Sequence, residues 1–269
     1  MEDILTEIVA HKRKEVAMYK LAVPTEGLRE LVDTLPPSPR SMKASLAASS
    51  TGIISEFKRK SPSKGWINQE ARPSEVIPAY WGGGASALSI LTDEHFFGGS
   101  LKDIKAVRPL IQLPILRKDF IIDEHQLFEA RLAGADAVLL IAACLTIDKC
   151  DELATIAHAI GLEVLLEIHS EKELPYVSCK PDMLGVNNRH LGSFVTDVQN
   201  SFRLAEALQQ TVKDVTDAPL LISESGISKP EIVLQLREVG YQGFLMGEAF
   251  MKERLPGMAL KRFMSALQT

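Results

Sequence analysis

A carboxylate and an ammonium group stand two residues apart near the end of an apolar stretch, residues 52–57. In an extended strand, side chains two positions apart point to the same face, so Glu56 and Lys58 are expected to lie together. The Ser-Pro-Ser-Lys-Gly sequence at 61–65 then predicts a turn. An isolated Glu-x-Lys pair is ordinarily a weak surface salt bridge. Here the pair follows an apolar run and precedes a stiff, hydroxyl-rich turn, which favours a substrate site.

Four other apolar stretches also end in polar side chains that can transfer protons or make hydrogen bonds. These side chains are Lys118, Asp119, Glu167, His169, Asn187, Asn188, Arg189, Ser223, Glu224 and Ser225. Any one of them has a simple explanation as a solvated loop end, but five polar strand ends in one chain do not. Ammonium groups beside carboxyl groups are the usual components of general acid–base catalysis. The pattern therefore predicts an enzyme site assembled from strand ends.

Small residues follow the last two predicted strands. Ser225-Gly226 in one loop and Gly247-Glu248 in the next can turn backbone N–H groups toward an anion. One glycine after a strand is weak evidence, but a pair in consecutive loops indicates a phosphate site. Ser61 could add a hydroxyl group to it, because the first and last strands of a closed barrel are neighbours. The Glu248 carboxylate is unfavourable to an anion, although its backbone N–H can still donate.

Eight apolar stretches supply the elements that must position these side chains. They span 52–57, 85–91, 114–118, 135–141, 162–168, 183–187, 219–223 and 243–246, and helical patterns follow them, as at 126–134, 146–160, 201–210 and 229–240. Continuous Val, Ile and Leu runs are typical of parallel strands buried on both faces. Eight βα units predict an α/β fold, a single (β/α)₈ TIM barrel, whose active site lies where the strands end. The alternative, a doubly wound open sheet, would normally place a glycine-rich turn where this chain has Lys58-Arg59-Lys60.

Some 50 residues precede the first strand. Ile4, Leu5, Ile8 and Val9 recur at helical spacing and the pattern continues to Val16, with further helices expected near 28–35 and 41–48. We interpret residues 1–50 as a helical extension that caps the barrel mouth, within one domain spanning 1–269. The loop at 60–66 is then expected to act as a mobile lid.

The composition gives no indication of a nucleic-acid-binding, membrane-spanning or metal-binding protein. With 269 residues and 46% hydrophobic content the chain can bury a large core, and a net charge of −5 gives no electrostatic reason to expect nucleic acid. No apolar run approaches the roughly 20 residues that span a bilayer. Three cysteines without metal-type spacing, and no signal peptide pattern, favour the cytoplasm. The histidines look peripheral, and no Glu-x-x-His or similar pattern predicts a metal site.

The chain resembles the indole-3-glycerol phosphate synthase family. The similarity covers almost the whole chain and rests on the stretches 54–63 (ISEFKRKSPS), 87–98 (ALSILTDEHFFG), 116–123 (LRKDFIID), 165–169 (LLEIH), 185–189 (GVNNR) and 223–227 (SESGI). The first and third are highly specific, whereas the phosphate glycines occur in many barrels. The resemblance implies a lyase of tryptophan biosynthesis. It converts 1-(o-carboxyphenylamino)-1-deoxyribulose 5-phosphate to indole-3-glycerol phosphate, carbon dioxide and water, without cofactor or metal.

The implied reaction gives each candidate residue a role. Ring closure needs an acid at the ketone oxygen, for which we assign Lys118, and dehydration needs a base, for which we assign Glu167. Glu56 would stabilise positive charge on the substrate nitrogen and Lys58 would pair with the carboxylate that is lost. How the two lysines divide the acid steps stays open. The other assigned residues are Asn187 and Ser225 for polar contacts, Phe120 and Leu139 for the aromatic ring, Arg189 and Glu224 for support, and Ser61, Gly226, Gly247 and Glu248 around the phosphate.

Two other functions compete with this interpretation. A sugar-phosphate isomerase of the same fold would share the two phosphate loops but has no need for Glu56, Lys58 and Lys118 together. A non-catalytic anion-binding protein would be expected to lack at least one of these charges, and none is missing. The expected partner is a small phosphorylated substrate, not nucleic acid or a membrane, with weak association with other tryptophan-pathway enzymes as a further expectation.

Overall fold

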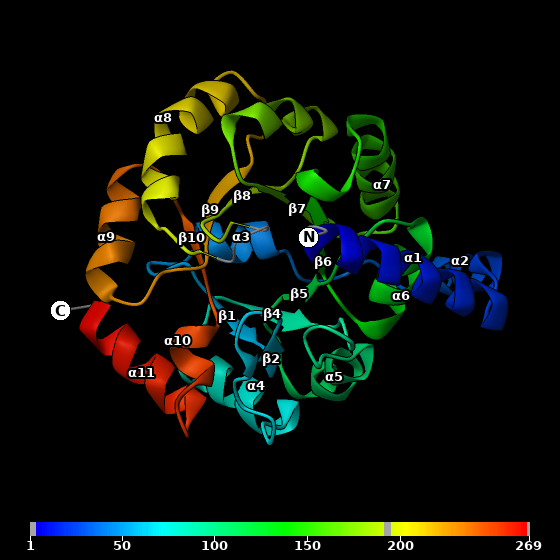
Figure 1. The fold of residues 1–269 in the computed structure, drawn as a ribbon, viewed down its shortest axis with the longest axis horizontal. Helices are drawn as coiled ribbons and strands as arrows, with labels where there is room; N and C mark the ends of the chain where they lie inside the picture. Colours follow the sequence, from blue (N-terminus) through cyan, green and yellow to red (C-terminus); the bar gives the residue numbers. More distant parts are fainter. Residues whose placement is uncertain (1–3, 191–194, 268–269) are drawn as a thin grey trace.

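The computed structural model describes residues 4–190 and 195–267. Eight parallel strands close into a barrel in the order β1-β10-β9-β8-β7-β6-β5-β4, and helices surround it (Figure 1). The barrel strands are β1 (Ile53–Phe57), β4 (Ala87–Leu91), β5 (Ile115–Lys118), β6 (Ala137–Ile141), β7 (Glu163–Ile168), β8 (Met183–Asn187), β9 (Leu220–Glu224) and β10 (Gly243–Met246). This arrangement confirms the predicted (β/α)₈ barrel, and each strand lies within two residues of its predicted position.

The helices of the outer layer surround the barrel in the order in which they occur in the chain. Its helices are α4 (Pro73–Gly82), α5 (Leu101–Val107), α6 (Glu124–Ala133), α7 (Ile147–Ala159), α8 (Gln199–Val212), α9 (Pro230–Glu238), α10 (Glu248–Met251) and α11 (Pro256–Leu267). Short 3₁₀ segments lie at η1 (Arg108–Leu110), η2 (Ala142–Cys144) and η3 (Glu171–Cys179). Within η3, Pro175 lacks an N–H donor and its ring would clash with an α-helical carbonyl, which accounts for the missing α-helix after β7.

Alternate residues of each strand face the barrel interior, and their character changes along the strand. Near the strand starts they are apolar, as at Ile54, Leu116 and Leu165, which belong to one buried cluster. Two residues further on, the same faces carry Glu56, Lys118 and Glu167. The remaining strand residues pack outward against the helices in a second and larger core. Strand alternation therefore gathers the charged groups at one end, above an apolar plug.

The N-terminal helices divide between the two ends of the barrel. α1 (Ile4–Ala22) runs across the mouth, and α2 (Thr25–Asp33) packs beside α6 (Figure 1). By contrast α3 (Met42–Ala47) lies at the opposite end, where Glu163 at the start of β7 accepts hydrogen bonds from the N–H groups of Met42 (2.6 Å) and Lys43 (3.0 Å). Met42 and Leu46 are fully buried there.

This placement corrects the prediction that residues 1–50 together cap the mouth. Only α1 approaches the mouth, and residues 1–3 lie outside the described part of the chain. α3 closes the bottom because its short apolar face complements the apolar ends of the strands. The 60–66 loop also differs from a simple turn, since β2 (Lys60–Ser61) and β3 (Gly65–Trp66) pair as a small antiparallel hairpin. No helix among the described residues is long and apolar enough to cross a membrane.

Candidate active site

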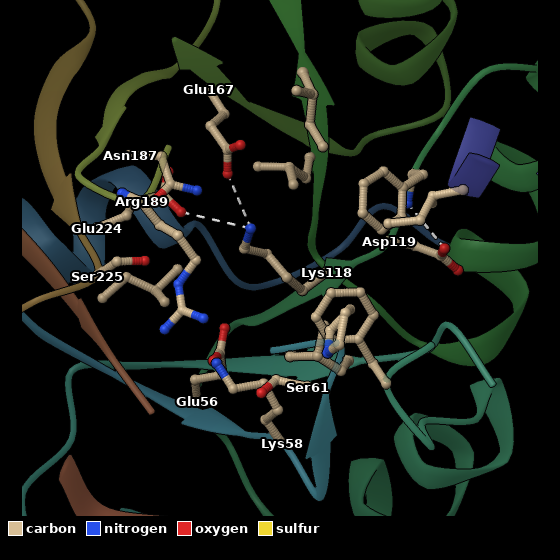
Figure 2. A pocket seen from close by; sticks show the side chains of 18 of the residues that line it. Glu56, Lys58, Ser61, Lys118, Asp119, Glu167, Asn187, Arg189, Glu224 and Ser225 are labelled. Atoms are coloured by element: carbon tan, nitrogen blue, oxygen red, sulfur yellow. Dashed lines mark hydrogen bonds and ion pairs between the residues drawn. The ribbon is translucent and has the colours of Figure 1, made fainter. Parts of the chain in front are cut away.

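Lys118 ends β5 and places its ammonium group between two carboxyl groups in the barrel mouth (Figure 2). Its Nζ lies 3.0 Å from Glu167 Oε2 on β7 and 3.6 Å from Glu224 Oε2 on β9. Both glutamates are only 1% exposed. Three strands that are distant in sequence thus bring one cation and two carboxyl groups together. We call these three residues the Lys118 cluster.

The two carboxyl groups of the cluster differ in pKa. Burial disfavours both carboxylates, but at Glu167 the nearby Lys118 and His169 outweigh it and lower the pKa. At Glu224 burial dominates, and with repulsion from Glu167 and Glu56 it raises the pKa to about 8. Burial also opposes the Lys118 charge, yet the surrounding carboxyl groups outweigh it and raise the pKa of Lys118. At neutral pH the cluster therefore holds an ionised Glu167, a neutral Glu224 and a charged Lys118.

Glu224→Gln is expected to stabilise the protein at pH 8 but not at pH 5. In the unfolded chain Glu224 loses its proton near the ordinary pKa of 4.5, whereas in the folded protein it keeps the proton up to a pKa of about 8. The free energy of unfolding of the native protein therefore falls as pH rises through this window, whereas glutamine does not titrate. Melting temperatures at the two pH values measure the effect, with the exposed Glu206→Gln as the control. A Tm difference that does not change with pH would contradict a neutral Glu224.

The predicted Glu56 and Lys58 pair is present beside the cluster. Lys58 Nζ lies 2.6 Å from Glu56 Oε1, and both side chains are largely buried. Two glycines leave room for the carboxyl groups: a Cβ atom at Gly247, which follows β10, would clash with Glu56, and one at Gly185 in β8 would clash with Glu224. The role of Gly185 was not predicted, because its only sequence signal is the absence of a side chain inside a strand.

His169 is not peripheral, contrary to the prediction. Its Nε2 lies 3.5 Å from Glu167 Oε1, so the imidazole contacts the carboxylate that also holds Lys118. The sequence placed His169 just after β7 but offered no metal or catalytic spacing that would assign it a contact. Among the described residues, no group of three or more His, Cys, Asp or Glu side chains is arranged to hold a metal ion.

An apolar wall faces the charged groups across the same cavity. Phe120 and Leu139, which were predicted to contact an aromatic ring, both line it. The lining also includes side chains that sequence reasoning missed, namely Ile4, Leu5, Ile8, Leu91, Phe97 and Ile141. Helical periodicity predicted the apolar face of α1, and residues 1–50 were expected to cap the mouth, but the contacts of individual α1 side chains with this cavity were not assigned. The cavity thus combines a flat apolar side with an ionised side.

A second cavity adjoins the first and contains the two predicted phosphate loops. Ser225, Gly226 and Gly247 line it together. Ser225 (φ 68°) and Gly226 (φ 77°) are both left-handed, an uncommon conformation for a serine and one that concentrates at functional sites. Ser61 does not join them: it lines the first cavity, and Ser63 takes its place here. The hairpin at 60–66 therefore brings Ser63, and not the predicted Ser61, to the cavity that contains the two glycine loops.

Arg189 lines both cavities and Glu248 lines the second, and both side chains contact the hairpin. Arg189 Nη1 donates to Ser63 Oγ at 3.1 Å, and its Nη2 lies 3.5 Å from Glu248 Oε2. Glu248 also forms an ion pair with Lys64. Burial opposes the Glu248 charge, but Lys64 and Arg189 outweigh it and lower the pKa of Glu248. The unfavourable carboxylate near the anion site is thus neutralised by two cations.

Asn187 completes the set of predicted residues. It ends β8 beside Glu224 of β9, and its Oδ1 accepts a hydrogen bond from Arg189 N at 3.0 Å. Its side chain also hydrogen-bonds Glu167. All fourteen predicted site residues therefore line one or both cavities at the barrel mouth. Ser61 lines the first cavity and not the second, and Glu248 is paired with Lys64 and Arg189.

Comparison with protein families places this geometry in context. The family model described as indole-3-glycerol phosphate synthase matches residues 5–263. An indole-3-glycerol phosphate synthase of Bacteroides thetaiotaomicron is 62% identical over 268 residues, which covers 100% of both chains. The protein of the same name from Azoarcus sp. is 38% identical over 265 residues, 97% of this chain and 98% of that one.

Solved structures share the fold at low sequence identity. Tryptophan synthase subunit alpha from Legionella pneumophila superposes with a TM-score of 0.62 at 16% identity, covering 86% of this chain and 99% of that chain. Thiamine phosphate pyrophosphorylase from Pyrococcus furiosus gives a TM-score of 0.58, also at 16% identity, over 85% and 98% of the two chains. At this identity the likeness extends to the barrel architecture alone.

Proposed function

The chain belongs to the indole-3-glycerol phosphate synthase family, and from this premise we propose how its barrel mouth carries out the family's reaction. It converts 1-(o-carboxyphenylamino)-1-deoxyribulose 5-phosphate to indole-3-glycerol phosphate, carbon dioxide and water in tryptophan biosynthesis. The proposal concerns which residues act. The observation that carries it is the position of Lys118, whose ammonium group contacts Glu167 and faces an apolar wall.

Ring closure is the first task. The aryl carbon that bears the carboxylate attacks the ketone carbon, and the ketone oxygen takes a proton as negative charge builds on it. Lys118 supplies that proton, since it stays charged at neutral pH and lies at the centre of the cavity. The aromatic ring rests on Phe120 and Leu139, with Leu5 and Ile8 of α1 covering it. Lys58 faces the substrate carboxylate.

Decarboxylation and dehydration complete the reaction. The bond to the carboxylate breaks, its electron pair restores the aromatic ring, and carbon dioxide leaves. The new hydroxyl group then takes a proton from Lys58, the second ammonium group on the cavity lining, and leaves as water. The substrate nitrogen meanwhile carries transient positive charge, which Glu56 stabilises. Glu167 removes the ring proton, because it is the ionised member of the Lys118 cluster. A neutral Glu224 can donate a hydrogen bond to oxygen while Asn187 orients the carboxylate beside it.

The substrate phosphate occupies the second cavity. Gly226 and Gly247 offer backbone N–H groups, Ser225 contributes its hydroxyl group, and Ser63 of the hairpin closes the space from the other side. This end of the substrate takes no part in bond breaking. Its binding free energy holds a flexible chain in the folded shape that ring closure needs, a proximity effect worth several kcal/mol.

The wider setting of the enzyme is also part of the proposal. Residues 1–269 act as one barrel unit in which α1 covers the mouth during catalysis, and the hairpin at 60–66 moves with substrate binding. The cytoplasm fits its three free cysteines, none of which is fully exposed. Weak association with other enzymes of the tryptophan pathway would shorten the path of the phosphorylated intermediates.

A fluorescence assay for indole-3-glycerol phosphate tests the function directly. The purified chain, incubated with the carboxyphenylamino deoxyribulose phosphate, is expected to release the fluorescent indole product without an added metal or cofactor. No turnover, with the substrate still bound through its phosphate, would contradict the proposal and favour an anion-binding barrel.

A further inference from the structure

Lys12 on α1 is a buried lysine with no role in the reaction described above. It is 1% exposed and continues the buried stripe of α1 formed by Leu5, Ile8 and Val16. Its Nζ lies 2.9 Å from Asp93 Oδ2 and 3.0 Å from Asp119 Oδ1. Burying a lysine inside an apolar stripe is unfavourable unless specific anions compensate it. Here two buried aspartates from the barrel do so.

Each aspartate shapes a loop that reaches the cavity. Asp93 follows β4, and its Oδ1 accepts hydrogen bonds from the N–H groups of Phe96 (2.8 Å) and Phe97 (3.3 Å). The turn that it holds presents Phe97 to the apolar wall. Lys12 therefore joins α1 to the loop that carries one side of the cavity.

Asp119 lies directly between Lys118 and Phe120. Its Oδ1 accepts from Phe120 N at 2.8 Å, and its Oδ2 accepts from Thr92 Oγ1 at 2.6 Å and from Arg117 Nη2 at 3.1 Å. Each side chain that holds Asp119 in place also holds its two neighbours in the chain. These are Lys118, the proposed acid, and Phe120, which lines the apolar side of the cavity. Lys12 is one of the side chains that hold Asp119 in place.

The charges of this group persist across the neutral range. Burial opposes the Asp119 carboxylate, but Lys12, Arg117 and the Thr92 hydroxyl outweigh it and lower its pKa to about 2. Burial likewise opposes the Lys12 charge, yet Asp119, Asp93 and Glu15 raise the pKa of Lys12. Among the described side chains, no other cation lies within ion-pair distance of Asp93. Without Lys12, α1 would cover two buried carboxylates that repel each other.

We propose that Lys12 is a positioning residue for catalysis: its ammonium group docks α1 on the mouth and fixes the two loops that carry Phe97, Lys118 and Phe120. Docking brings Ile8 and Leu5 over the cavity, about one and two helical turns before Lys12 respectively. The covering helix and the placement of the acid are thereby coupled through one cation. The kinetic consequence rests on the proposed function, whereas the docking of α1 does not.

Lys12→Met tests the inference, with the exposed Lys14→Met as the matched control on the same helix. Methionine keeps the length and apolar stem of the side chain but lacks the charge. We expect KM to rise about tenfold and kcat/KM to fall about ten- to a hundredfold, because displacements near 1 Å already cost about a hundredfold. Hydrogen exchange of the 4–22 amides should become at least about tenfold faster, while the barrel strands keep their protection. Lys14→Met should match the native protein in both measurements.

A second substitution separates positioning from simple stability. Asp93→Asn in the Lys12→Met background removes one unpaired carboxylate and keeps an oxygen for the Phe96 N–H. The double variant should recover part of the kcat/KM lost in Lys12→Met, although Asp93→Asn alone lowers kcat/KM. Effects of the two substitutions that are not additive would show that Lys12 and Asp93 interact. A merely structural residue would lower the melting temperature without changing KM.

The outcomes are distinct. Lys12→Met with KM and α1 exchange within twofold of Lys14→Met would overturn the inference. If Lys12→Met does not fold, Asp93→Asn alone decides: faster α1 exchange with a raised KM supports the coupling, and native values of both overturn it. If the native protein shows no turnover, the proposed function fails, and the exchange measurement still tests whether Lys12 docks α1.

Discussion

Lys118→Ala is expected to lower kcat by about a hundredfold or more with a small change in KM, since general acids commonly contribute 10²–10⁴-fold, roughly. The ammonium group lies against Glu167 and Glu224, and Lys118 does not line the second cavity, where we propose that the phosphate binds. Its loss therefore removes a transition-state interaction and leaves substrate binding largely intact. Steady-state kinetics at equal folded concentration, followed by the fluorescence of the product, measures the effect.

The exposed Lys102→Ala on α5 is the control for this experiment, because it removes a lysine charge that lines neither cavity. It should retain native kcat and KM. If Lys118→Ala keeps native activity, the acid is not Lys118, and the role passes to Lys58, the other ammonium group on the cavity lining. Circular dichroism establishes that the variant is folded, since removing Lys118 leaves two buried carboxyl groups without their cation.

Glu167→Gln should lower kcat by about a hundredfold to a thousandfold, the range expected when a general base is lost. Glutamine has the same shape and can still accept a hydrogen bond from Lys118 Nζ, which lies 3.0 Å from the carboxylate in the native protein. The substitution therefore removes basicity while the local packing is kept. KM should change little, because Glu167 is assigned to dehydration and not to binding.

Glu171→Gln provides the comparison, since it makes the same chemical change at an exposed position of η3 four residues later. It should have no effect on kcat. A Glu167→Gln rate within about fivefold of the native rate would mean that another group removes the proton. Single-turnover measurements then show whether an intermediate that still holds its hydroxyl group accumulates, as loss of the dehydration base requires.

The barrel could be predicted from local patterns because each strand carries its own signal. Runs such as Ala137–Ile141 are apolar, rich in branched side chains and bounded by glycines or helix starts. Eight such runs at βα spacing determine the fold, and the fold then brings Glu56, Lys118 and Glu167 to one end. The residue types and the strand ends were therefore sufficient to predict that these side chains meet at the barrel mouth.

Other features depend on which distant segments meet, and no local pattern encodes that. α3 has the same helical signal whether it covers the mouth or the bottom, and its position follows from the Glu163 carboxylate and the apolar strand ends. Lys12 belongs to the basic run at 11–14 (HKRK), for which a solvated helix face is the ordinary expectation. In the structure it is buried between Asp93 and Asp119. The raised pKa of Glu224 depends equally on tertiary surroundings, namely burial near other carboxyl groups.

The closure of the barrel bottom by α3 determines how molecules enter and leave the enzyme. Met42 and Leu46 close the bottom, and the apolar side chains of the strands fill the space above them. Carbon dioxide, water and the indole product must then all leave through the barrel mouth by which the substrate entered, past α1. Because the barrel has a single open end, the rate of product release through the mouth, and not only the chemistry, can limit kcat.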